Sequence, residues 1–167
     1  MSAFADTQHA DVPDGTSFHG IPRFYRNAPL ALGRCIHAAT VLGADVCVHA
    51  GDLIDGKAKE GSADAFQRMV RVCTADSAPP IAFAIGNHEL YHLSREHVHG
   101  VLSETSCFPV TQEHAVFGGM TWPSAGLTVL VLDSFDIGTE GWNTEHPHVV
   151  AAQTLLRHIN PNLHELN

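Results

Sequence analysis

Short apolar runs that end in glycine and polar residues constrain this chain more than any other feature of its sequence. One β-branched run covers residues 45–50 and leads into Gly51-Asp52, and a second covers residues 81–85 and leads into Gly86-Asn87-His88. Uninterrupted apolar runs of this length are typical of strands that are buried on both faces of a sheet. Segments of helical periodicity alternate with the runs, which predicts an α/β fold with a largely parallel sheet.

The remaining elements follow from the same patterns. Apolar residues recur at helical spacing around the strands, with Gly43 as a stop signal after one helix and Ser62 as a cap before the next. Residues 9–20 are rich in Asp, Gly, Pro and Thr, which is typical of a loop. The expected helices are residues 24–42, 62–75 and 149–159, and the further expected strands are residues 2–5 and 127–132.

The composition limits the partners that the chain can bind. Its 167 residues are about the length of one domain, and 44% of them are hydrophobic, which is enough for a buried core. The 9 Lys and Arg residues against 18 Asp and Glu residues give a net charge of −9, which argues against a nucleic-acid partner. An anionic substrate would therefore need positive charge from another source, such as a bound metal ion.

The expected compartment is the cytoplasm. No apolar run approaches the roughly 18–20 residues of a membrane span, and the N-terminal stretch lacks the basic and apolar regions of a signal peptide. The 4 cysteines form no Cys-x-x-Cys pair, and Cys47 and Cys73 fall inside expected elements. Reduced thiols are therefore the preferred interpretation, with disulfides as the alternative.

Polar side chains follow three separate strands and are expected to meet at one edge of the sheet. Asp6 and Gln8 follow the first strand, Asp52 follows the second, and Asn87 and His88 follow the third. Ligands of open α/β sheets bind beyond the carboxyl ends of the strands. Oxygen and nitrogen donors of this kind suit Mn²⁺, Fe or Zn²⁺, and a carboxylate on a central strand can bridge two ions for in-line displacement at phosphorus.

These residues resemble the first three motifs of the calcineurin-like metallophosphoesterases. The motifs are Asp6-x-Gln8, residues 51–56 (Gly-Asp-Leu-Ile-Asp-Gly) and residues 86–89 (Gly-Asn-His-Glu). Gln at the second ligand position, where the superfamily usually has His, is similar to the manganese-dependent ADP-ribose/CDP-alcohol diphosphatases. Further segments resemble that group as well, namely residues 23–26, 131–136 and 160–162.

The resemblance implies both a fold and a chemistry. The fold is the N-terminal portion of a four-layer α/β/β/α metallophosphoesterase sandwich. Asp6 and Gln8 would bind one divalent ion, Asp52 would bridge, Asn87 would bind a second ion, and His88 would assist the transition state. The ions would be Mn²⁺, with Fe or Zn²⁺ as alternatives. A metal-bound hydroxide would attack in line the phosphoanhydride of a small nucleoside diphosphate compound, such as ADP-ribose or a CDP-alcohol.

Two residues are candidates for substrate binding. Phe18 lies in the loop after the first ligand pair, where it either stacks on a nucleobase or packs against Phe24 and Tyr25. Arg26 lies at the expected start of a helix, where a cation opposes the helix dipole. We therefore expect another reason for this arginine, such as contact with a substrate phosphate.

Other polar residues near the motifs have structural interpretations. Asp55 is expected to brace the turn before Gly56, and Glu89 either caps the helix that follows or supports the ligands. Asp133 is interpreted as structural, and His9 is not counted as a ligand. Three further histidines are interpreted as part of a solvated loop, with an adventitious zinc site as the alternative. They are His92, His97 and His99.

The chain lacks two motifs that the resemblance leads one to expect. Superfamily members carry a Gly-His and a Gly-His-x-His motif nearer the C-terminus, and no His within residues 146–164 follows a Gly. Residues 1–167 are therefore interpreted as a single, incomplete metallophosphoesterase domain. Three functions stay open: a phosphohydrolase that cleaves a phosphoanhydride, a phosphodiesterase or phosphomonoesterase, and a truncated non-catalytic paralogue or fragment that binds nucleotide or a partner without turnover. Uncovered apolar faces predict an isolated chain that is poorly soluble or oligomeric.

Overall fold

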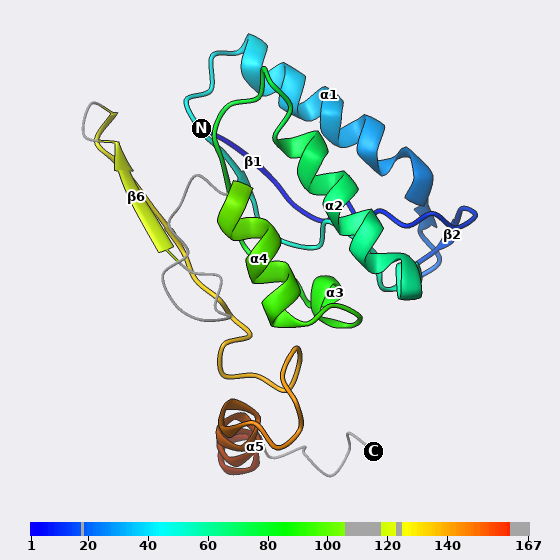
Figure 1. Cartoon of the computed structure of the whole chain (residues 1–167), viewed down its shortest axis with the longest axis vertical. Helices are drawn as coiled ribbons and strands as arrows, with labels where there is room; N and C mark the ends of the chain where they lie inside the picture. Colours follow the sequence, from blue (N-terminus) through cyan, green and yellow to red (C-terminus); the bar gives the residue numbers. More distant parts are fainter. Residues whose placement is uncertain (18, 106–117, 123–124, 161–167) are drawn as a thin grey trace.

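A three-stranded parallel sheet carries the segments in which the expected ligands lie (Figure 1). This computed structural model describes residues 1–17, 19–105, 118–122 and 125–160. The sheet has the order β1 (Ser2–Phe4), β4 (Cys47–His49) and β5 (Ile81–Phe83), with Phe4, His49 and Phe83 in register. The three strands end level with one another, so the residues that follow them lie at one edge, which confirms the predicted mixed α/β fold with a parallel sheet.

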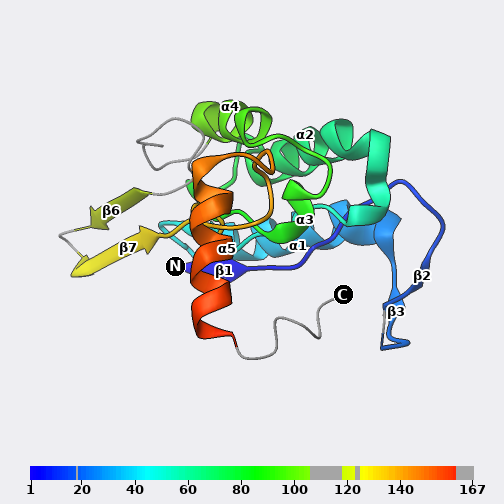
Figure 2. The same cartoon turned by 90° about the horizontal axis from the view of Figure 1, so that it is seen from below.

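Three helices cover one face of this sheet, as Figures 1 and 2 show. They are α1 (Ala28–Val41), α2 (Ser62–Cys73) and α4 (Arg95–Thr105). Strand residues Cys47, Ile81 and Phe83 form one buried cluster with Leu32 of α1 and Phe66 of α2. Complete burial of a side chain such as Phe66 stabilises the fold by roughly 1.5–3 kcal/mol. The apolar stripe of each helix is therefore what attaches it to the sheet.

Two predicted helix boundaries were wrong. Helix α1 begins at Ala28, after the 3₁₀ turn η1 (Tyr25–Asn27), and not at residue 24. Pro29 lies in the first turn of α1, which is the only part of a helix that tolerates a proline without losing a hydrogen bond. Ser62 is the first residue of α2 and its hydroxyl is buried, so it does not cap the helix; Gly61 occupies that position.

The apolar run at residues 127–132 forms a strand as predicted, but this strand does not join the parallel sheet. Strand β7 (Leu127–Val131) pairs in antiparallel register with β6 (Gly118–Trp122). Its residues alternate in exposure: Leu130 is 71% exposed, whereas Val131 is buried and packs with Ala82 of β5 in a second, smaller apolar cluster. An apolar residue on the solvent side of a hairpin makes the run look continuous, so the sequence pattern did not distinguish the two arrangements.

A buried ion pair joins the hairpin's exit to α4. The Arg95 guanidinium lies 2.6 Å from the Asp133 carboxylate, and both side chains are almost fully buried. Arg95 also lies over the Trp142 ring, 4.4 Å from its centroid. Asp133 thus has the structural role expected of it. Beyond Trp142 the chain enters α5 (Pro147–Ile159), which projects from the end of the molecule in Figure 1.

The cysteines within the described residues form no disulfide. Cys47 and Cys73 are buried, Cys35 is exposed, and all three are free thiols; Cys107 lies outside the described residues. None of the helices in the described ranges has the length and apolar character that a membrane crossing needs.

Short elements complete the described fold. They are β2 (Gly15–Thr16), which pairs with β3 (Pro22–Arg23), the 3₁₀ segment η2 (Gly56–Gly61) and α3 (Asn87–Leu90).

Candidate active site

The segment after β1 runs beside the segment after β4. The backbone N–H of Asp6 donates to the Gly51 carbonyl at 3.2 Å, that of Gln8 to the Asp52 carbonyl at 2.9 Å, and that of His9 to the Leu53 carbonyl at 2.9 Å. These bonds extend the parallel pairing of the sheet past the ends of its strands. They bring two segments that are more than forty residues apart in the chain, and three of the predicted ligands, to the same edge.

The backbone is strained at those three positions. Asp6, Gln8 and Asp52 have φ angles of 55°, 48° and 58°, and Lys59 is the other non-glycine residue with a positive φ in the described ranges. This left-handed region is uncommon for residues other than glycine and costs about 1–3 kcal/mol per residue. Such strain clusters at functional sites, where the surrounding structure holds it in place. Its coincidence with the predicted ligands supports a functional site here.

Two glycines allow the loops after β4 and β5 to touch. Gly51 has a φ of 98°, and a Cβ atom built on it would lie 2.6 Å from the Gly86 nitrogen. A Cβ atom on Gly86 would collide with the Asp52 carboxylate. No larger residue fits at either position without moving the backbone, so both glycines are needed for the close approach.

The Asp52 carboxylate lies between Gln8 and His88. Its Oδ1 accepts the backbone N–H of His88 at 3.2 Å, and its Oδ2 accepts the Gln8 side-chain amide at 3.4 Å. The other amide atom of the Gln8 side chain, Oε1, is buried and has no hydrogen-bond partner among the described residues. An amide oxygen that is buried without a partner beside a carboxylate fits a hard divalent cation, which would satisfy both oxygens.

Glu89 ties the two loops together. Its carboxylate accepts the backbone N–H groups of Gly86, Asp52, Leu53 and Ile54 at 2.9, 3.1, 2.6 and 3.3 Å. The residue is only 1% exposed, and this burial raises the pKa of the Glu89 carboxyl above its ordinary value. Both sequence interpretations of Glu89 hold, because it caps α3 and also holds the backbone of Asp52.

His88 has one ring nitrogen committed to the protein. The backbone N–H of Gly56 donates to His88 Nδ1 at 3.0 Å. A nitrogen that accepts a hydrogen bond carries no proton, so a neutral His88 ring has its proton on Nε2 and can donate it to a ligand. Asp55 accepts the backbone N–H of Lys57 at 2.9 Å, which confirms that it braces this turn.

Tyr91 and His92 belong to the same cluster; sequence reasoning missed Tyr91 and interpreted His92 as part of a solvated loop. The Asn87 side-chain amide donates to the Tyr91 hydroxyl, which leaves the amide oxygen for another partner. His92 Nε2 donates to the Gly56 carbonyl at 2.9 Å, so His92 is not merely a solvated residue. Together with His88, these residues lie at positions i, i+3 and i+4, a helical spacing that places them on one face and could have revealed the cluster.

Other predicted site residues lie apart from this cluster. The Asp6 side chain is exposed and lines a cavity of about 430 Å³ with Phe24 and Asn27, although its backbone adjoins Gly51. Arg26 donates to Asp11 at 2.8 Å in an exposed ion pair, which lowers the pKa of the Asp11 carboxyl. Phe18 lies outside the described residues.

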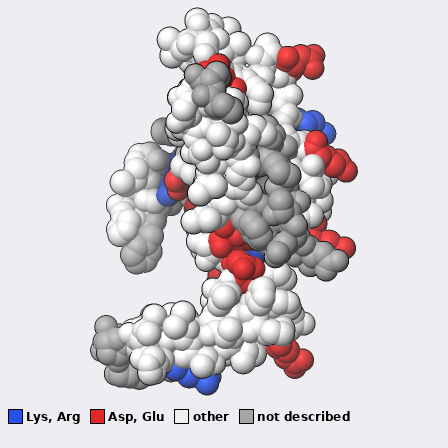
Figure 3. Space-filling view, turned by 90° about the vertical axis from the view of Figure 1, so that its left-hand side faces the viewer, with Lys and Arg blue, Asp and Glu red and all other residues white. Residues whose placement is uncertain are grey.

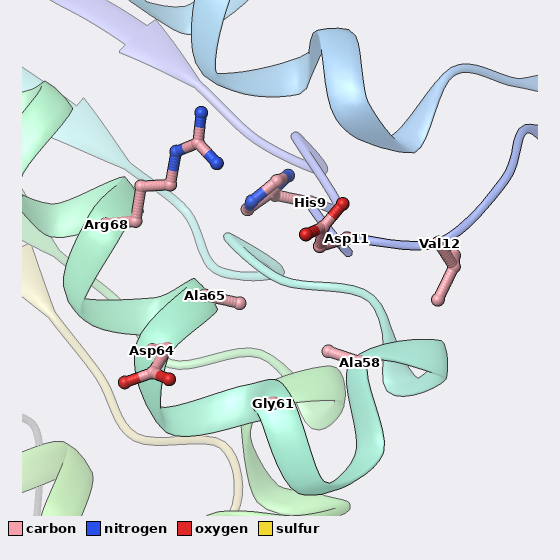
Figure 4. Close-up of a pocket in the computed structure, with 8 residues that line it drawn as sticks. All are labelled: His9, Asp11, Val12, Ala58, Gly61, Asp64, Ala65 and Arg68. Atoms are coloured by element: carbon pink, nitrogen blue, oxygen red, sulfur yellow. The ribbon is translucent and has the colours of Figure 1, made fainter.

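His9 is buried rather than solvated. Its Nδ1 donates to the Tyr25 carbonyl at 2.9 Å, because a carbonyl can only accept, and its ring lines a cavity of about 250 Å³. In Figure 4, His9 and Asp11 lie next to each other on one segment, and Arg68 extends from α2. This cavity borders the segment that carries Gln8 and does not include Asp52 or His88.

The donor set at the sheet edge consists of one carboxylate and two amides, with a second carboxylate, that of Asp6, on an adjoining segment. In the described ranges, no group of three or more His, Cys, Asp or Glu side chains is arranged to hold a metal ion. The residues that point to a cation are therefore of mixed type: Asp52 and Gln8 side by side, Asn87 in the next loop, and Asp6 adjacent through its backbone. All four offer the hard oxygen atoms that Mn²⁺ and Mg²⁺ bind.

Comparisons with known proteins agree with this chemistry. The family model described as calcineurin-like phosphoesterase matches residues 4–164. The chain is 36% identical over 164 residues to a manganese-dependent ADP-ribose/CDP-alcohol diphosphatase of Arabidopsis thaliana, covering 97% of this chain and 50% of that protein. It is 29% identical over 191 residues to the human protein of the same name, covering 100% of this chain and 52% of that protein.

A solved structure has a similar fold. The crystal structure of a dimetal phosphatase from Danio rerio superimposes with a TM-score of 0.76 at 22% identity, over 97% of this chain and 52% of that chain. The chain thus spans about half the length of the curated relatives it matches.

Proposed function

Because the chain belongs to the calcineurin-like phosphoesterase family, we propose that it carries out the metal-dependent hydrolysis of a phosphoanhydride bond. The proposed substrates are small nucleoside diphosphate compounds such as ADP-ribose and CDP-alcohols, which relatives matched along this chain are named for. Manganese is the proposed metal for the same reason. The observation that carries the proposal is the contact of Asp52 with Gln8 and His88 at the end of a parallel sheet.

The residues that would hold the metal ions are Asp6, Gln8, Asp52 and Asn87. Divalent ions held there would supply positive charge to the phosphate oxygens and to the attacking water. The buried, unpartnered Gln8 Oε1 supports this assignment. Asp52 is held in place for this role by the backbone N–H of His88 and by Glu89, which binds the Asp52 backbone.

His88 is the proposed catalytic residue. Because its Nδ1 accepts from Gly56, the proton on Nε2 is available to a phosphate oxygen or to the leaving group. The ring packs against Tyr91 at a centroid distance of 5.1 Å, which limits its rotation. These two contacts orient the ring, and a neutral ring with this hydrogen bond has its proton on Nε2.

Arg26 and Phe18 are the proposed substrate contacts, with phosphate and nucleobase respectively. Arg26 is paired with Asp11, but both side chains are largely exposed. An exposed ion pair contributes little to stability, so a phosphate can replace Asp11 at little cost.

Hydrolysis of ADP-ribose and of a CDP-alcohol in the presence of Mn²⁺ tests the proposal. We expect turnover that requires Mn²⁺ and that falls at least about 100-fold in Asp52→Asn, on the scale of losing one charge-stabilising group. Asp64→Asn, an exposed carboxylate of α2, is the matched control and should retain activity. Mn²⁺ binding without turnover in the natural sequence would contradict the proposal and favour the non-catalytic alternative.

A further inference from the structure

His49 is a buried titratable residue that the proposed mechanism does not use. It is the last residue of the central strand β4 and is 0% exposed. Both of its ring nitrogens have partners in the loops around it. Gly51 N–H lies 3.3 Å from Nδ1, and the Thr7 hydroxyl lies 3.3 Å from Nε2.

The partners determine the direction of each hydrogen bond. A backbone N–H can only donate, so His49 Nδ1 accepts and carries no proton. The neutral ring then has its proton on Nε2, which donates to the Thr7 oxygen. The Thr7 hydroxyl in turn donates to the Leu53 carbonyl at 3.2 Å, because a carbonyl can only accept. The result is one directed chain: Gly51 N–H to His49, His49 to Thr7, and Thr7 to Leu53.

This hydrogen-bond chain runs beside three of the four proposed metal ligands. Its two ends, Gly51 and Leu53, are the neighbours of Asp52. One of its inner members, Thr7, lies between Asp6 and Gln8. These three ligands have left-handed backbone conformations, which persist only where the surrounding structure holds them. The His49–Thr7 hydrogen bond thus links the two strained segments, in addition to the Gln8–Asp52 side-chain contact.

We propose that His49 and Thr7 are positioning residues that set the spacing between the Asp6–Gln8 segment and Asp52 for ion binding. The part that concerns the ion rests on the proposed function. Residues that orient metal ligands typically change metal affinity by about 10–100-fold when they are removed. A side chain that only fills the core would change stability without a specific effect on this edge.

Three variants of the full chain test the proposal. Thr7→Val keeps the shape and removes the hydroxyl, and Thr7→Ser restores it. Thr40→Val is the matched control, because the Thr40 hydroxyl also donates to backbone carbonyls, those of Ile36 and Ser77, in a different part of the molecule. The readouts are the exchange rates of the Gln8 and His9 amide protons by NMR, and the Mn²⁺ dissociation constant by electron paramagnetic resonance.

We expect Thr7→Val to speed exchange of the Gln8 and His9 amides about tenfold or more, and to weaken Mn²⁺ binding by about 10-fold or more. Thr7→Ser should return both values to within about threefold of the natural sequence, and Thr40→Val should change neither. In the natural sequence, ¹⁵N chemical shifts of the His49 ring should show a proton on Nε2 and none on Nδ1.

Unchanged exchange in Thr7→Val, or an equal change in Thr40→Val, overturns the positioning role. The opposite His49 tautomer overturns it as well. Mn²⁺ binding that depends on Thr7 in a chain that hydrolyses neither substrate supports the inference while the proposed activity fails. A natural sequence that binds no Mn²⁺ overturns the metal part of both, and the exchange rates then decide whether His49 and Thr7 hold the two segments together.

Discussion

At the scale of single residues, the Glu89 carboxylate has the most demanding role, because it satisfies four backbone N–H groups in two loops. Glu89→Ala should lower the free energy of unfolding by at least about 3 kcal/mol, since buried donors left without a partner cost about 1–3 kcal/mol each. Glu96→Ala, an exposed acidic residue in the first turn of α4, should cost less than about 1 kcal/mol. Urea denaturation measures both, and equal losses would contradict this role of Glu89.

The pH dependence of stability should report on His49. Burial lowers the pKa of His49 from 6.5 to about 4. Between those values the unfolded chain binds a proton that the folded chain does not, so stability falls as the pH is lowered through this window. At 1.36 kcal/mol per pKa unit, the loss attributable to His49 is about 3 kcal/mol, and it is absent above pH 6.5.

Unfolding free energies of the natural sequence and of His49→Gln, measured between pH 7 and pH 4, isolate this contribution. The variant should be less stable at pH 7 and should show a flatter slope. His37→Gln, an exposed histidine on α1, should keep the natural slope. Parallel slopes for the natural sequence and His49→Gln would show that His49 does not titrate in this way.

The sequence predicted part of this residue-level detail. Asp52, Gly51 and Gly86 could be placed because a strand end followed by glycine has few possible conformations. The role of His49 and the hydrogen-bond partner of Tyr91 could not be predicted. Each depends on which partner from a distant segment comes within hydrogen-bond distance, and residue type alone does not determine this.

At the scale of elements, η2 and α3 are held together through Gly56. Its N–H and carbonyl bind His88 and His92, and a Cβ atom on it would lie 2.8 Å from the Tyr91 ring. Gly56→Ala should destabilise the fold by about 1–3 kcal/mol, the usual cost of an added methyl group in a packed place. Gly100→Ala, inside α4, is the control, because a Cβ atom added there meets nothing within 4 Å. Thermal unfolding followed by circular dichroism should show a lower midpoint for Gly56→Ala alone.

The boundaries and the pairing of the elements could be predicted only in part from sequence patterns. Helix α5 was predicted at residues 149–159, two residues short at its start, because Pro147 in its first turn was not read as a start signal. Helix α1 was predicted four residues too long at its start, because apolar spacing continues through η1 and only Pro29 marks the boundary. Strand β7 was predicted, but its antiparallel pairing with β6 was not, because an apolar run does not show which neighbour it pairs with.

At the scale of the whole molecule, apolar side chains are exposed on the hairpin and on α5. Most of the projecting α5 region and of the hairpin is white in Figure 3, with few charged side chains. The exposed residues of these two parts and the segment between them include Leu130, Leu132, Ile137, Val150, Leu155 and Ile159. Surfaces of this kind favour association.

The isolated chain should therefore self-associate. Light scattering at micromolar concentration should give a mass above the 18.0 kDa of one chain, and Leu130→Lys with Leu155→Lys should lower it. Val41→Lys with Leu42→Lys, equally exposed apolar positions at the end of α1, should not. A monodisperse species of 18.0 kDa for the natural sequence is the outcome that counts against this prediction.

The left-handed conformations of Asp6, Gln8 and Asp52 lower the stability of the fold in order to keep side chains that can bind an ion at these positions. Glycine adopts that conformation without a steric penalty, so selection for folding alone would have placed glycine there. Keeping oxygen-bearing side chains at these positions gives up part of the stability margin of the whole molecule. Selection of variants for thermal stability alone should therefore favour glycine at these three positions, and such variants would lose the proposed metal site.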